Sequence, residues 1–154
     1  MRLLSGDGTS LELTVAGYQY PHLVGVPYDS NWLIIAGSVT LDDREWKFRY
    51  PCLLTNELLA LADWFHSLSE APSDNGEIGF IEPNLSFRWR QGVLQIYLDL
   101  ESRPSWAPED NTKEFYLRFS PTPDELASAA SSLRADLLKY PIRPERQQGA
   151  PRDG

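Results

Sequence analysis

Two stretches of alternating apolar and polar residues constrain this chain more than any other feature of its sequence. A short polar segment, Arg90-Gln91-Gly92, separates them. A period of two places alternate side chains on opposite faces of a strand, and a glycine-containing connection between two such stretches favours a tight turn. The segment therefore predicts an antiparallel hairpin. Its apolar positions are Leu85, Phe87 and Trp89 in the first stretch and Leu94, Ile96 and Leu98 in the second.

Other parts of the chain carry further strand signals. Residues 11–15 alternate in the same way, and residues 32–36 are continuously apolar, as expected of a strand covered on both faces. An acidic turn at residues 41–44 leads into a second alternating stretch, which predicts another hairpin. We expect a mostly antiparallel sheet of about six or seven strands. The remaining strand signals lie at residues 46–50, 78–81 and 115–119.

Two segments have the spacing of helices. Residues 55–69 begin at Thr55, a suitable N-cap, and their apolar residues recur three and four positions apart. Residues 122–140 begin with a capping threonine, a proline at the first helical position and Glu125 three residues after the cap. Both helices are expected to pack against the sheet. The predicted fold class is therefore α+β and rich in β-structure.

The length of 154 residues suits one domain. We assign residues 1–140 to it and expect a long loop at 102–113. The segment 141–154 is rich in Pro, Gln, Arg and Gly, a composition that predicts a disordered tail.

The chain contains 14 basic and 22 acidic side chains, a formal net charge of −8. Such a charge repels phosphate backbones and anionic lipids, so nucleic acid and membrane surfaces are poor partners, whereas a basic protein is attracted. The same charge would also serve solubility alone. No apolar run approaches the roughly 20 residues of a membrane helix. The apolar stretch at the N-terminus is too short for a signal peptide. A single cysteine permits no internal disulfide. These features predict a cytoplasmic protein.

Motifs of catalysis are missing from the sequence. It has no P-loop, no dinucleotide-binding glycine pattern and no nucleophile elbow. Its two histidines, His22 and His66, are far apart, and Cys52 stands alone among apolar neighbours, which favours a buried structural thiol. We therefore predict no catalytic residues, no metal site and no cofactor.

Two polar clusters interrupt otherwise apolar stretches, at residues 28–32 (YDSNW) and 81–87 (IEPNLSF). Asp, Ser and Asn cap the entry to a strand and proline marks a bulge or an edge, so both clusters have a structural explanation. They would also provide carboxylate and amide groups that anchor a partner.

Several strings in the chain together resemble the WapI-like family of bacterial immunity proteins. They are GYQYP, YDSNWLII, the strand around Trp46, LLTNELLALADWF and FIEPNLSF, and they extend from Gly17 to Leu98. The resemblance implies a cytoplasmic inhibitor of a cognate toxin domain from a polymorphic or contact-dependent toxin system. The name-giving member is associated with a toxin that acts on tRNA. Nuclease toxins are commonly basic, which agrees with an acidic inhibitor that covers the toxin's active site or a nearby surface.

We expect the toxin to contact the loop at residues 99–112, which combines acidic residues with an exposed aromatic one. The predicted partner-binding residues are Asp99, Glu101, Trp106, Glu109 and Asp110 in this loop, together with Asp29 and Asn31. A competing hypothesis is a small-molecule-binding or enzymatic domain with an aromatic-lined pocket. That pocket would be formed by Trp32, Trp46, Trp89 and Tyr97. The oligomeric state stays open.

Overall fold

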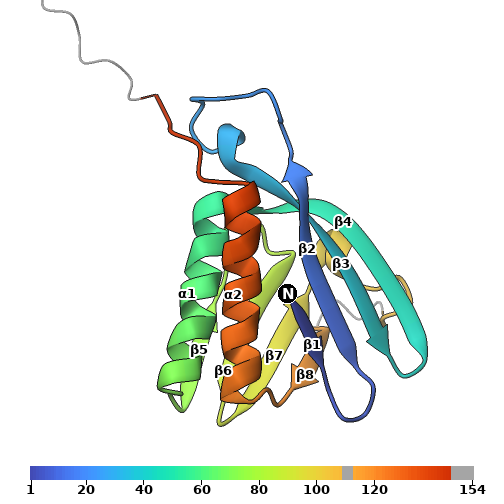
Figure 1. The fold of residues 1–154 in the computed structure, drawn as a ribbon. Coiled ribbons are helices and arrows are strands. Elements are labelled where there is room, and N and C mark those ends of the chain that lie inside the picture. The colour runs from blue at the N-terminus through green and yellow to red at the C-terminus, as the bar shows by residue number, and fades with distance from the viewer. Residues whose placement is uncertain (109–112, 147–154) are drawn as a thin grey trace, which may run out of the picture.

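The computed structural model describes residues 1–108 and 113–146. Within them the chain forms two helices and eight strands (Figure 1), which confirms the α+β class and the antiparallel pairing. The strands form two sheets of four, whereas we had predicted one sheet of six or seven. They are β1 Arg2–Leu4, β2 Ser10–Tyr18, β3 Trp32–Leu41, β4 Arg44–Leu54, β5 Asn75–Ile78, β6 Leu85–Arg90, β7 Val93–Leu98 and β8 Tyr116–Phe119.

The first sheet is the meander β1-β2-β3-β4. Asp42 and Asp43 form the turn between β3 and β4, and both have positive φ, as a tight hairpin turn requires. Gly37 lies opposite Phe48 in this pair, and the phenyl ring covers the glycine so closely that a Cβ there would lie 2.1 Å from the ring. Strand β1 carries too few residues for its alternation to stand out in the sequence, and we did not predict it.

The second sheet has the order β5-β6-β7-β8. Its central hairpin is the one predicted, with Leu85 opposite Leu98 and with Gln91 and Gly92 at positive φ in the turn. Strand β5 pairs with β6 from Asn75 and ends at Ile78, so the strand predicted at 78–81 was wrong in all but its first residue.

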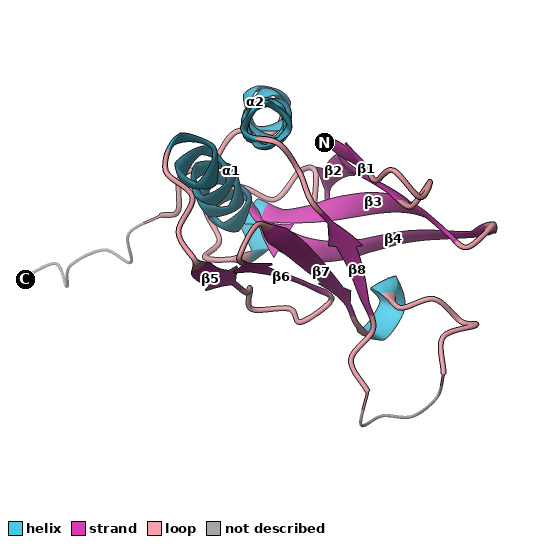
Figure 2. Ribbon diagram, turned by 90° about the horizontal axis from the view of Figure 1, so that it is seen from below, coloured by secondary structure: helices cyan, strands magenta, loops and turns pink. Residues whose placement is uncertain are grey.

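Helix α1 lies between the two sheets in the order of the chain. Strand β4 leads directly into α1 (Thr55–Glu70), and the chain then returns as β5 in the second sheet. Helices α1 and α2 (Pro123–Lys139) lie side by side, and Figure 2 shows them together on one side of the strands. Both sheets and both helices contribute to one hydrophobic core, in which Phe65 of α1 meets Phe87 of β6 edge-to-face.

Both helices begin within a residue of the predicted positions. Thr122 caps α2 and receives a hydrogen bond from the Glu125 amide, as predicted. Thr55, in contrast, is the first helical residue of α1 and not its cap. The Glu57 carboxylate accepts the backbone N–H of Leu54 at 2.9 Å, and the Thr55 hydroxyl turns instead to Asn31.

The segment after α2 differs from the disordered tail predicted at 141–154. Its residues 141–146 lie along the loop between β2 and β3, where Glu145 pairs with Gly25. The Arg143 guanidinium donates to the carbonyls of Tyr20, Pro21 and Leu23 and lies 3.5 Å from the centre of the Tyr18 ring. Composition alone misses these contacts because they depend on a distant loop. Residues 147–154 lie outside the described residues. None of the helices described is long and apolar enough to cross a membrane.

Candidate partner-binding surface

The predicted contact loop begins with a tight turn after β7. Residues 99–102, here called the 99–102 turn, contain a short 3-10 helix, Leu100–Ser102. The Asp99 carboxylate accepts the Leu100 N–H at 2.8 Å, and the Ser102 hydroxyl accepts the Asp99 N–H at 3.0 Å. The turn is therefore held by its own polar side chains, which gives it one defined shape.

Asn84 joins this turn to the loop before β6, the FIEPNLSF segment of the sequence. Its carbonyl accepts hydrogen bonds from the Asp99 N–H and the Ser102 hydroxyl, and its side-chain amide donates to Glu101 at 2.8 Å. Asn84 is fully buried, and its Oδ1 has no hydrogen-bond partner among the described residues. The sequence placed the 81–87 cluster and the contact loop in separate parts of the chain, but the fold brings them together.

The turn is also fixed to the first sheet. The indole N–H of Trp46, on β4, donates to the Ser102 carbonyl at 2.9 Å. The 99–102 turn is therefore held in place by hydrogen bonds with Trp46 of the first sheet and with Asn84 of the loop before β6, and this suits a surface that must match a partner.

Carboxylates dominate the electrostatics of this region. The hydrogen bond from Asn84 holds the pKa of Glu101 below its ordinary value, so Glu101 is charged at neutral pH. The charge of Glu101 in turn raises the pKa of Tyr50. Burial, and secondarily the charges of Glu101 and Glu82, raises the pKa of the Cys52 thiol to about 12, so Cys52 is a neutral thiol and not a nucleophile.

Two apolar side chains stand out among these acids. Leu100 is 54% exposed and Ile81, on the adjoining loop, is 58% exposed. Neither was predicted from the sequence to contact a partner. No sequence signal marks an exposed apolar residue, because its exposure depends on how the two loops meet.

Trp106 differs from the exposed aromatic residue that we predicted. It is half-buried, it meets Phe115 edge-to-face with ring centres 5.8 Å apart, and the Arg44 guanidinium lies 5.1 Å from its ring. The indole thus packs between Phe115, just before β8, and Arg44, at the start of β4. Glu109 and Asp110 lie outside the described residues.

Asp29 and Asn31 do not join the 99–102 turn. They belong to the 3-10 helix Asp29–Asn31, before β3. Asp29 is exposed, but Asn31 is 5% exposed and bonds Thr55 and Arg143 inside the protein. The amide of Asn31 is therefore a structural link between the loop, α1 and the C-terminal segment.

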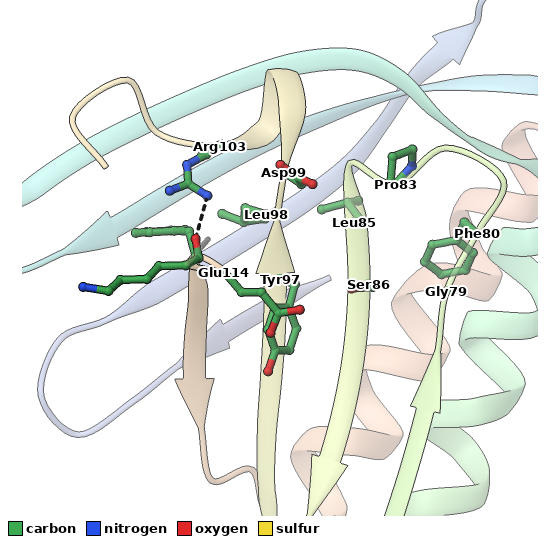
Figure 3. Close-up of a pocket in the computed structure, with 12 residues that line it drawn as sticks. Gly79, Phe80, Pro83, Leu85, Ser86, Tyr97, Leu98, Asp99, Arg103 and Glu114 are labelled. Carbon is green, nitrogen blue, oxygen red and sulfur yellow. Dashed lines mark hydrogen bonds between the residues drawn. The ribbon is translucent and has the colours of Figure 1, made fainter. Parts of the chain in front are cut away.

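A hollow of about 390 Å³ lies beside the turn on the outer face of β6 and β7 (Figure 3). Tyr97 lines it, together with acidic and basic side chains that include Asp99 and Arg103. Of the four aromatic residues predicted to line a pocket, this hollow contains Tyr97 alone. Trp46 and Trp89 bond backbone carbonyls through their indole nitrogens, and Trp32 lies on the first sheet. Among the described residues no three His, Cys, Asp or Glu side chains gather as a metal site would require.

Comparison with known families agrees with the resemblance noted in the sequence. A sequence model of the Immunity protein WapI-like family matches residues 2–141. The match extends beyond the strings at 17–98 to nearly the whole chain, and it includes the 99–102 turn and α2. Comparisons with curated proteins and with solved structures found no match.

Proposed function

We propose that this chain, which belongs to the Immunity protein WapI-like family, binds a cognate toxin domain in the cytoplasm and neutralises it. The family match over residues 2–141 is the observation that carries the proposal. Immunity by binding needs no catalysis, which agrees with the lack of catalytic motifs in the sequence.

The proposed contact surface is the 99–102 turn with the adjoining loop before β6. Its exposed apolar residues, Leu100 and Ile81, are accompanied by the carboxylates of Asp99, Glu101 and Glu82. Apolar groups at the centre and charged groups at the rim are typical of protein–protein interfaces. We expect the matching toxin surface to be basic, as nuclease domains commonly are.

Charge supports the same partner. A net charge of −8 would attract a basic toxin over several ångströms and speed encounter, and this attraction falls as salt screens it. The competing small-molecule hypothesis has less support, because its four aromatic residues do not line one pocket: Tyr97 lines the hollow beside the turn and Trp89 lines another, of about 310 Å³.

Co-expression with the polymorphic-toxin domain encoded beside this gene tests the proposal. We expect a complex that survives purification, rescue of growth from an active toxin, and a Kd that rises with added salt. Growth arrest by the toxin despite full expression of this protein, with no complex on purification, would contradict the proposal for that pair.

A charge variant localises the surface. Glu101→Gln keeps an acceptor for Asn84 but removes one charge, and an exposed ion pair contributes about 0.2–1 kcal/mol, so we expect binding weaker by up to about fivefold at low salt. Glu70→Gln, at the exposed end of α1, is the matched control because it removes the same charge elsewhere. Equal losses in both variants would point to net charge alone and not to this surface.

A further inference from the structure

Leu100 occupies a backbone conformation that leucine rarely adopts. Its φ is +48°, in the left-handed region where the Cβ of an ordinary residue is crowded and glycine is preferred. Its side chain is 54% exposed, so it contributes little to the hydrophobic core. The backbone conformation therefore disfavours a leucine at this position, and burial of the side chain in the free protein offsets little of that cost.

The conformation at position 100 does not depend on the leucine side chain. The bonds that impose it come from the Asp99 carboxylate, the Ser102 hydroxyl and the Asn84 carbonyl, together with a backbone bond from the Arg103 N–H to the Leu100 carbonyl. A glycine or an asparagine at position 100 would leave all of these bonds in place, with less backbone strain. The fold of the turn thus leaves the choice of leucine unexplained.

The other non-glycine residues at positive φ in the described part of the chain divide into two kinds. Asp42, Asp43 and Gln91 are polar and occupy the hairpin turns described above. Tyr28 resembles Leu100, since it has φ +59° and is 59% exposed, but it lies on the loop between β2 and β3. These two positions combine strain with an exposed large side chain.

The surroundings of Leu100 indicate what would cover it. Asp99 and Glu101 flank it in the chain, and the bonds of Asn84 bring the loop of Ile81 and Glu82 to the same turn. An apolar side chain that projects from a rim of carboxylates is poorly suited to anionic lipid or to nucleic acid, whose phosphates the rim repels. It suits an apolar recess on a protein surface bordered by Lys or Arg.

We propose that Leu100 is the apolar anchor by which this protein docks on its toxin, and that it enters a recess rimmed by basic side chains. The inference rests on the proposed function. Beyond the proposed function, it names the residue that contributes most to the affinity for the toxin. The net charge alone does not identify that residue. Burial of its side chain in the complex accounts for a leucine at a left-handed position.

The variant Leu100→Gly separates binding from folding. We expect the Tm of the free protein to be unchanged or higher, because glycine relieves the backbone strain. We expect the Kd for the co-expressed toxin domain to rise at least tenfold, through faster dissociation. Leu100→Asn, which tolerates the left-handed region, should behave in the same way and guards against added flexibility in the glycine variant.

Gln91→Gly is the matched control, since it places glycine at another left-handed position, in the turn between β6 and β7, and should leave the Kd unchanged. Wild-type protein that does not bind the toxin would contradict the proposed function itself. Wild-type binding with an unchanged Kd for both Leu100 variants would overturn the present inference alone. A lower Tm in both Leu100 variants would also overturn it, because the leucine would then serve the fold.

Discussion

Replacement of Asn31 by alanine tests whether this residue serves the fold or the partner. The Asn31 side chain makes three hydrogen bonds and is 5% exposed. Its Oδ1 accepts from the Thr55 hydroxyl and from the Arg143 N–H, each at 2.8 Å, and its Nδ2 donates to the Arg143 carbonyl at 3.0 Å. Asn31→Ala removes all three bonds at once.

The expected loss follows from these bonds. Three hydrogen bonds at about 1 kcal/mol each give a loss of about 3 kcal/mol in the free energy of unfolding. The Thr55 hydroxyl is fully buried and would lose its partner, which makes about 3 kcal/mol the lower end of the expected loss and about 5 kcal/mol its upper end. For a domain of this size, 3 kcal/mol corresponds to a fall in Tm of roughly 6–12 °C.

Urea denaturation of four proteins measures this loss: the wild type, Asn31→Ala, Thr55→Val and the double variant. We expect the double variant to lose about 1–2 kcal/mol less than the sum of the single losses, because Thr55→Val removes the hydroxyl that Asn31→Ala leaves unpaired. Hydrogen exchange at residues 141–146 should speed up in Asn31→Ala. A loss below about 1 kcal/mol with no coupling would refute this reasoning.

Folded Asn31→Ala should keep its affinity for the toxin domain, whereas a specific loss of binding would return Asn31 to the contact surface.

Three further predictions concern the fold and its titrating groups. Gly37→Ala should lower the free energy of unfolding by about 1–3 kcal/mol, measured by denaturation, because its Cβ would displace the buried ring of Phe48. The thiol of Cys52, fully buried and with a pKa of about 12, should react with a thiol reagent at pH 8 only after unfolding, and rapid labelling of the native protein would contradict its burial. The pKa of Glu101 is lower in the folded protein than its ordinary value, so ionised Glu101 stabilises the fold at any pH above that ordinary value. This contribution is lost as the pH falls through the pKa of Glu101 in the folded protein. An NMR titration should find the pKa of Glu101 closer to ordinary in Asn84→Ala, and an unchanged pKa would show that the amide is not its cause.

Local patterns in the sequence determined the elements. The hairpin at residues 85–98 follows from alternation around Gln91 and Gly92, and the start of α2 follows from Thr122 and Glu125, because each depends on neighbours in the chain. The net charge and the WapI-like resemblance also needed no coordinates. Strand β1 was not predicted, because its three residues carry little periodicity. The cap of α1 was predicted wrongly, because the Thr55 hydroxyl bonds Asn31, which is far from it in sequence.

Only the tertiary structure decided how these elements meet. It divided the strands into two sheets, it placed the 99–102 turn against Asn84, and it buried Asn31 against Arg143, which is 112 residues away. Burial and hydrogen bonding between such distant residues are properties of the assembled chain, and no local pattern encodes them. The exposure of Leu100 and its left-handed backbone arise in the same way, from the bonds that close the turn around it.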